Sequence, residues 1–169
     1  CEKLAAVHDA NGRDVWVVTI EVNTNKFYAY KVSVAGVSAP VISTLGRVYV
    51  APDMPRAYLK FSPNGQKIFS IVGWFNGAAE LFDFSNSTGV VSNRIGLDVH
   101  SYGASFSNNS QMLYAADNTQ VFQYDVSSNN AATILASKQQ VGTVPGLMRA
   151  MQLGIDGKIY IANASNNAF

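Results

Sequence analysis

The sequence predicts an all-β fold, a β-propeller-like array of four-stranded antiparallel blades, and three observations support this class. First, a strand-turn-strand unit recurs along the 169 residues, with its turn residue at Gly12, Gly65, Ser110 and Gly157. Second, these positions are 53, 45 and 47 residues apart, close to the roughly 40 to 50 residues of a four-stranded propeller blade. Third, the inner strands are apolar on both faces, as stacked blades require.

The best-defined unit spans residues 57–72, with the sequence AYLKFSPNGQKIFSIV. Pro63 fixes φ at the first central position of a tight turn, and Asn64 and Gly65 tolerate a positive φ. We therefore expect this turn to join two strands, with Gly65 at φ > 0. Related sequences occur at 4–18 (LAAVHDANGRDVWVV), 106–116 (FSNNSQMLYAA) and 153–163 (LGIDGKIYIAN).

Burial of inner strands on two faces is the physical reason for this pattern, and residues 68–72 (IFSIV) illustrate it. A β-sandwich is the alternative class, because it also contains hairpins and buried central strands. We favour the propeller, since a sandwich has no reason to repeat one turn chemistry at one period. Six phenylalanines on inner strands are then expected to be buried between blades: Phe27, Phe61, Phe69, Phe82, Phe106 and Phe122.

The chain is expected to form one domain of about three and a half blades, approximately residues 1–50, 51–98, 99–142 and 143–169, the last incomplete. Pro40 interrupts the fourth strand of the first blade, residues 37–45, and is acceptable there only at an outer edge or a strand end. Residues 131–139 (AATILASKQ) are predicted as the fourth strand of the third blade, with a short helix as the alternative. The predicted strands are 4–7, 14–19, 26–33, 37–45, 58–61, 67–72, 79–84, 90–97, 102–106, 111–116, 120–126, 131–139, 149–153 and 158–162.

A ring of six to eight blades needs on the order of 250 to 350 residues, so we expect this chain to be part of a larger propeller. Alone, it is expected either to close as a four-bladed ring or to associate with itself through its open blade edges. Cys1 heads the chain without an initiating Met. We favour a fragment boundary there; the alternative is the lipid-bearing first residue of a mature bacterial lipoprotein.

The composition, 48% hydrophobic and 14% charged, allows a sizeable core. A formal net charge of +1, with no run of like charges, argues against nucleic acid and membrane-surface partners. The single cysteine excludes an intrachain disulfide and a cysteine-based zinc site. No apolar run has the length of a transmembrane span. Abundant Tyr, Phe, Ser, Asn and Thr indicate an extracellular or cell-surface protein.

Several of these segments carry a family resemblance: YLKFSPNGQKIF (58–69), YGASFSNNSQMLYAAD (102–117) and MQLGIDGKIYIAN (151–163). They resemble the WD40-like and YVTN-type β-propeller repeats of secreted or surface-attached bacterial proteins. The opening AAVHDANGRDVWVVT (5–19) with NKFYAYKVS (25–33) is similar to a first blade of that group. Ser110 departs from the family pattern by replacing a turn glycine. The resemblance implies an extracytoplasmic repeat module and transfers no catalytic residue.

The sequence contains no nucleophile, dinucleotide, P-loop or HExxH motif, so we expect no catalytic residue, metal or cofactor. The best conceivable metal set, His100 with Asp53 and Asp98, depends on loop proximity alone. Asp83 and Asp125 occupy matching strand positions, and we interpret them as hydrogen-bond acceptors that cap their blades.

The residues that come just before the first strand of each blade surround one end of a propeller channel. These positions hold Arg56, His100 and Arg149, with Tyr58 and Tyr102 beside them. Cations and tyrosines that converge there suit an anionic or carbohydrate ligand, through charge-assisted hydrogen bonds and ring contacts. The alternative is that the cations merely decorate exposed loops.

Two functional classes remain open. The first is a non-catalytic binding or scaffold module of a bacterial surface or secreted protein, with a glycan, a small anion or a protein as its partner at the channel mouth. The second is a propeller enzyme of the lactonase or glycan-cleaving kind. The predicted first strands, 4–7, 58–61, 102–106 and 149–153, contain no Asp or Glu, which favours binding.

Overall fold

The computed structural model describes residues 3–48, 58–72, 78–144, 146 and 148–163, which form four antiparallel sheets. The first sheet contains β1 (Leu4–His8), β2 (Val15–Ile20), β3 (Lys26–Ser33), β4 (Gly36–Val37) and β5 (Val41–Thr44). The second contains β6 (Leu59–Phe61), β7 (Lys67–Val72), β8 (Ala78–Phe84) and β9 (Val91–Leu97). The third contains β10 (Ser101–Phe106), β11 (Met112–Asp117), β12 (Gln120–Asp125) and β13 (Gln139–Thr143), and the last is the hairpin of β14 (Met148–Leu153) and β15 (Ile159–Asn163).

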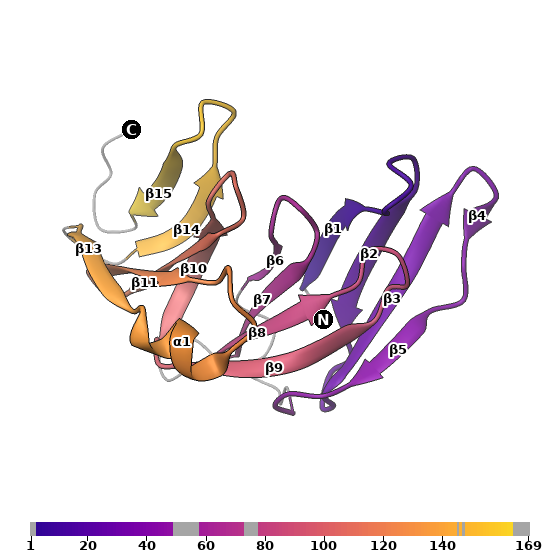
Figure 1. Cartoon of the computed structure of the whole chain (residues 1–169), viewed down its shortest axis with the longest axis horizontal. Coiled ribbons are helices and arrows are strands. Elements are labelled where there is room, and N and C mark those ends of the chain that lie inside the picture. Colours follow the sequence, from indigo (N-terminus) through magenta and orange to yellow (C-terminus); the bar gives the residue numbers. More distant parts are fainter. Residues whose placement is uncertain (1–2, 49–57, 73–77, 145, 147, 164–169) are drawn as a thin grey trace.

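The sheets follow one another like the blades of a fan, and each packs against the next (Figure 1). The predicted all-β array of four-stranded antiparallel blades is therefore confirmed. The first sheet and the last hairpin lie at the two ends of the fan (Figure 1). The described residues thus form an open array, and the predicted closure into a four-bladed ring is wrong; association through blade edges stays a prediction. No described helix is long and apolar enough to cross a bilayer.

The fourth strand of the first blade differs from the prediction. Residues 37–45 form two short strands, β4 and β5, and both pair with β3. Pro40 lies between them, and because proline lacks a backbone N–H it cannot continue a ladder. The outer edge of this sheet is therefore broken where the sequence places the proline.

Residues 131–139 do not form the predicted strand, and the alternative of a short helix is correct. Helix α1 (Ala131–Ala136) begins after Asn130, whose side chain accepts a hydrogen bond from the Thr133 backbone N–H at 3.0 Å. This cap favours a helix start, and the helix places Ile134 in the core with no exposed surface. Strand β13 can begin only after the helix, at Gln139.

Strand β7 shows why the inner strands are apolar on both faces. Ile68 pairs in register with Phe82, and Phe69 pairs with Leu81. The first pair packs into the core between the first and second sheets, while the second pair packs into the core between the second and third. All four side chains are completely buried, so two-sided burial is confirmed for this strand.

Four of the six phenylalanines predicted between blades are fully buried: Phe27, Phe69, Phe82 and Phe106. The other two are only partly buried, so the prediction is wrong for them. Phe61 is the last residue of the short strand β6, and its ring makes an edge-to-face contact with Phe84 at a centroid distance of 4.9 Å. Phe122 packs against the core between the second and third sheets, with the amine of Lys138 4.5 Å from its ring centroid.

The recurring turns keep one backbone conformation across the four sheets. Gly12, Gly65 and Gly157 have φ of 70°, 68° and 77°, which confirms the positive φ predicted for Gly65. Ser110 adopts the same conformation at φ 63°, although serine carries a Cβ. The shared turn chemistry therefore reflects a shared turn geometry, including at the position where the sequence departs from glycine.

Candidate functional site

The inner edge of the array surrounds a cavity of about 300 Å³. Strands β1, β6, β10 and β14 all contribute to its wall, one strand from each sheet. Because the first strand of every blade reaches this space, it lies where the axis of a propeller would run. Its wall includes Ala6, His8, Lys60, Ser105, Gln152 and Leu153.

Tyr58 and Tyr102, from the second and third sheets, meet at the start of these strands. Their ring centroids are 5.9 Å apart at an interplanar angle of 68°, which is an edge-to-face contact. Both rings are half-buried. Burial raises the pKa of the Tyr58 hydroxyl above its ordinary value, and the neighbouring Tyr102 adds to that shift. Tyr58 is therefore a neutral hydrogen-bonding group at neutral pH.

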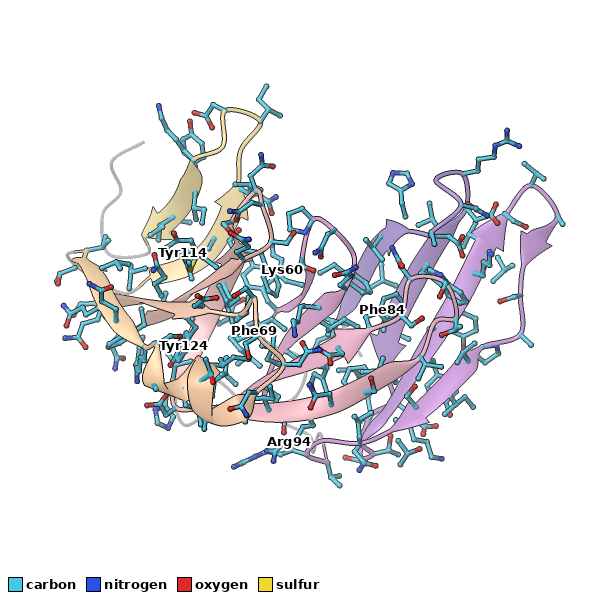
Figure 2. All side chains as sticks on the ribbon, in the orientation of Figure 1. Lys60, Phe69, Phe84, Arg94, Tyr114 and Tyr124 are labelled. Atoms are coloured by element: carbon cyan, nitrogen blue, oxygen red, sulfur yellow. The ribbon has the colours of Figure 1, made fainter. Side chains whose placement is uncertain are left out.

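Lys60 contacts the Tyr58–Tyr102 pair and adds a cation to it. Its amine lies 4.9 Å from the ring centroid of Tyr58 and donates a 2.6 Å hydrogen bond to Oε1 of Gln152. The amine thus links the second sheet to the last hairpin, and Figure 2 shows Lys60 near the middle of the array. Burial lowers the pKa of this lysine. We call Tyr58, Lys60, Tyr102 and Gln152 the channel site.

Of the other residues predicted at the channel mouth, only His100 has a described side chain. The ring of His100 is exposed, and its backbone N–H donates to Oδ2 of Asp117 at 3.3 Å. Arg149 belongs to β14, but its side chain lies outside the described part of the structure. Arg56 also lies outside the described residues. Of the five predicted residues, the structure brings Tyr58 and Tyr102 together.

Sequence reasoning missed Lys60 and Gln152. A signal for Lys60 was present, because it is a charged residue inside a strand that blade packing is expected to bury. Gln152 carried no such signal, since its role depends on how far the last hairpin reaches across the inner edge.

Three of the four carboxylates that the sequence singled out accept hydrogen bonds: Asp83, Asp98 and Asp125. Asp98 accepts hydrogen bonds from the Tyr124 hydroxyl and the Lys138 amine, both at 3.0 Å. Asp53 lies outside the described residues, and within those residues no group of three metal-ligand side chains occurs. Asp83 and Asp125 act as hydrogen-bond acceptors, as interpreted from their strand positions.

Two buried charged residues, Lys3 and Glu80, lie where the first and second sheets meet. Glu80 is completely buried, and its Oε1 accepts a 2.6 Å hydrogen bond from Nε of Arg94, whose side chain is 41% exposed. Lys3, 1% exposed, donates from its amine to the backbone oxygen of Ile71. Burial lowers the pKa of Lys3 to about 7, against the opposing influence of Glu80. These contacts tie the chain before β1 to the second sheet.

No family model matches the chain, and no curated protein matches it by sequence. Solved structures match it by shape. A proposed 6-phosphogluconolactonase from Bacteroides fragilis has a TM-score of 0.59 at 10% identity, over 94% of this chain and 41% of that one. A gluconolactonase from Xanthomonas campestris has a TM-score of 0.57 at 14% identity, over 94% and 52%. The hydrazine synthase of Kuenenia stuttgartiensis has a TM-score of 0.54 at 12% identity, over 95% and 58%.

These likenesses establish a class, the β-propeller-type proteins, and at such low identities they concern the fold alone. The chain spans between 41% and 58% of the length of these three proteins.

Proposed function

We propose that this chain is a non-catalytic binding module of propeller type that binds the anionic group of a ligand at the channel site. Lys60 is the observation that carries the proposal. Its half-buried side chain lies on the channel wall, and none of the ion pairs among the described residues includes its amine. A partly desolvated cation without a carboxylate partner gains strongly from a ligand carboxylate or phosphate.

The surroundings of Lys60 suit a ligand that also carries hydroxyl groups. The tyrosine pair supplies ring surface and a hydroxyl group at one end of the strands, and Gln152 supplies an amide beside the amine. Sugar acids combine a carboxylate with hydroxyls and with apolar ring faces that stack on aromatic residues. An acidic glycan is therefore the class of ligand that we assign to the site, and Arg56 and Arg149 are proposed to add positive charge at its mouth.

We further propose that the module belongs to a bacterial secreted or cell-surface protein of the WD40-like or YVTN-type repeat group. The repeated strand-turn-strand sequences and the β-rich composition support this assignment. Among the described residues, no further sheet covers the outer face of the first sheet or of the β14–β15 hairpin, and such open ends suit assembly with further blades or with a second copy (Figure 1).

A lactone-hydrolysing enzyme is the competing function, because two of the solved structures are described as lactonases. Strands β1, β6, β10 and β14 contain no Asp or Glu, so the inner strands offer no carboxylate as a general base. This absence on the channel wall favours binding over hydrolysis.

Calorimetric titration with glucuronate and with glucose tests the proposal. Glucuronate is expected to bind and glucose to bind far more weakly, with glucuronate affinity falling as salt rises, because the contact is ionic. Lys60→Met is expected to abolish the difference between the two sugars. Lys158→Met is the matched control, because Lys158 is 78% exposed and lies on the β14–β15 turn.

The proposal is wrong if Lys60→Met binds glucuronate as tightly as the natural chain does. A Lys60-dependent release of acid from gluconolactone would instead establish the lactonase alternative.

A further inference from the structure

A second cavity, of about 580 Å³, lies between the second and third sheets, beside the turns that follow β6 and β10. It shares no lining residue with the channel cavity, although Pro63 of that cavity directly precedes Asn64 of this one. Residues from two of the recurring turns, within 64–67 and 109–111, line it together with residues from the segments 83–86 and 126–129. We call it the turn-side cavity. Its volume is within the range of about 300 to 1,000 Å³ that is typical of small-molecule sites.

The first turn fixes the orientation of a glutamine amide. Oδ1 of Asn64 accepts from the Ser62 hydroxyl at 2.7 Å and from the Gln66 backbone N–H at 3.1 Å. Nδ2 of Asn64 then donates to Oε1 of Gln66 at 3.3 Å. Because its oxygen is engaged, the Gln66 side chain presents its NH₂ group, for which the described residues supply no acceptor.

The second turn repeats this arrangement with the corresponding residues. Oδ1 of Asn109 accepts from the Ser107 hydroxyl at 2.7 Å and from the Gln111 backbone N–H at 3.2 Å. Its Nδ2 donates to Oε1 of Gln111 at 2.9 Å, which leaves the Gln111 NH₂ group as a second donor without an acceptor in the described chain. Two adjacent blades therefore line the same cavity with oriented amide donors.

The far wall is polar but electrically balanced. The Lys67 amine is bonded to Oδ1 of Asp83 at 2.7 Å and to Oδ1 of Asn129 at 2.5 Å. Oδ2 of Asp83 accepts from Nδ2 of Asn93 at 2.9 Å. The lysine and aspartate charges cancel within one pair, and Asn129 keeps its NH₂ group as a donor beside them. The two apolar lining residues, Phe84 and Val126, are almost completely buried, so the accessible wall is polar.

We propose that the turn-side cavity binds a neutral saccharide. Sugar hydroxyls accept from amide NH₂ groups and donate to carbonyl and carboxylate oxygens, so they match a wall that holds both kinds of group. A phosphate or carboxylate ligand finds no unpaired cation there, because Lys67 already holds Asp83. The paired turn amides are oriented before binding, which reduces the ordering cost of a weak polar site. This site is separate from the channel site and goes beyond the function proposed above.

The test uses the full chain and a panel of neutral disaccharides of glucose, galactose, mannose and N-acetylglucosamine, measured by saturation-transfer NMR and calorimetry. At least one is expected to bind with an affinity that salt does not change, since no ion pair forms. The double variant Gln66→Ala/Gln111→Ala is expected to lower that affinity about tenfold or more, because each lost hydrogen bond weakens binding roughly fivefold. Each single variant is expected to lose about fivefold, which keeps the test usable if the double variant unfolds.

Two controls separate this cavity from other sites. Gln120→Ala/Gln140→Ala removes an exposed glutamine pair from β12 and β13, joined at 3.1 Å, and is expected to leave saccharide binding unchanged. Lys60→Met is also expected to leave it unchanged. The proposal is overturned if no disaccharide binds, if the Gln66 and Gln111 variants bind as well as the natural chain, or if Lys60→Met removes the binding.

Discussion

The backbone N–H of Asn64 donates a hydrogen bond of 3.0 Å to the hydroxyl of Ser110, and this bond joins the turns of two successive sheets. Ser110 has the positive φ, 63°, that glycines adopt in the other three turns. A non-glycine residue in this conformation costs roughly 1 kcal/mol, and one hydrogen bond contributes about as much. At Ser110, the cost of the backbone conformation is therefore offset by a hydrogen bond between two blades.

Substitutions at Ser110 separate these two contributions. Ser110→Ala loses the hydrogen bond and keeps the strained backbone, whereas Ser110→Gly loses the bond and relieves the strain. We expect the glycine variant to be about as stable as the natural chain and the alanine variant to be less stable by about 1 kcal/mol. Urea unfolding measures both. Equal stability of the alanine and glycine variants would show that the backbone at Ser110 is not strained.

Gly65 and Gly12 provide a matched pair of turn glycines, with φ of 68° and 70°. A Cβ at Gly65 would lie 2.9 Å from Cγ2 of Val7, whereas a Cβ at Gly12 would meet nothing within 4 Å. Gly12→Ala is expected to cost about 1 kcal/mol through backbone strain alone. Gly65→Ala, and Gly65→Val still more, should cost more than that. Thermal unfolding compares them, and equal losses for the two alanine variants would contradict the predicted clash with Val7.

Phe82 tests the packing of the first blade against the second. Its ring meets that of Phe27 at a centroid distance of 4.9 Å, and neither ring is exposed. Phe82→Ala is expected to destabilise the fold by about 3–5 kcal/mol, because it opens a cavity at the centre of this interface. Phe122→Ala, at a partly buried ring, should cost clearly less. Guanidinium unfolding gives both values, and the reverse order would refute the blade register described above.

The ion pair of Asp9 with Lys31 leads to a prediction of how the free energy of unfolding changes at acid pH. Its carboxylate lies 2.8 Å from the Lys31 amine and accepts the Asn11 backbone N–H at 2.8 Å. These contacts, the lysine first, lower the pKa of Asp9. A lowered folded-state pKa gives stability that is present above the pKa of the unfolded chain, about 3.9, and is lost as the pH falls through the folded value.

Asp9→Asn is therefore expected to reduce stability at pH 6 and to flatten its fall between pH 5 and pH 2, as followed by urea unfolding at each pH. Glu21→Gln removes an exposed carboxylate that lies 3.6 Å from Lys26, and it is expected to change that pH profile little. An Asp9→Asn variant with the full acid dependence of the natural chain would contradict the assignment.

The structure of the outermost segment of a sheet was not predicted reliably from the sequence. Residues 131–139 suit a strand and a short helix almost equally by local preference. The helix forms, with the Asn130 side chain capping its start and Ile134 completing the core. In the first sheet, Pro40 predicted that its strand lies at an edge, but it did not predict the division of that strand into β4 and β5. Outer strands pack against fewer neighbouring elements, so local interactions determine their secondary structure.

The sequence predicted only part of the candidate site. Tyr58 and Tyr102 were predicted from their positions before successive first strands, because the repeat fixes which residues begin a blade. Lys60 and Gln152 were not predicted, although a 2.6 Å hydrogen bond joins them. That contact spans 92 positions in the sequence. It exists only because the fan brings the last hairpin back across the inner edge.

The sequence by itself determined the class of fold. A repeated turn and strands that are apolar on both faces are local patterns, and stacked blades bury both faces of such strands. The sequence also determined the positive φ of Gly65, because Pro63 and Asn64 restrict the turn around it. Only the tertiary structure decided which polar groups meet: Lys60 with Gln152, Asn64 with Ser110, and Lys67 with Asp83. The physical reason is that burial follows from hydrophobic periodicity along the chain, whereas a polar contact depends on distances of about 3 Å between segments that only packing brings together.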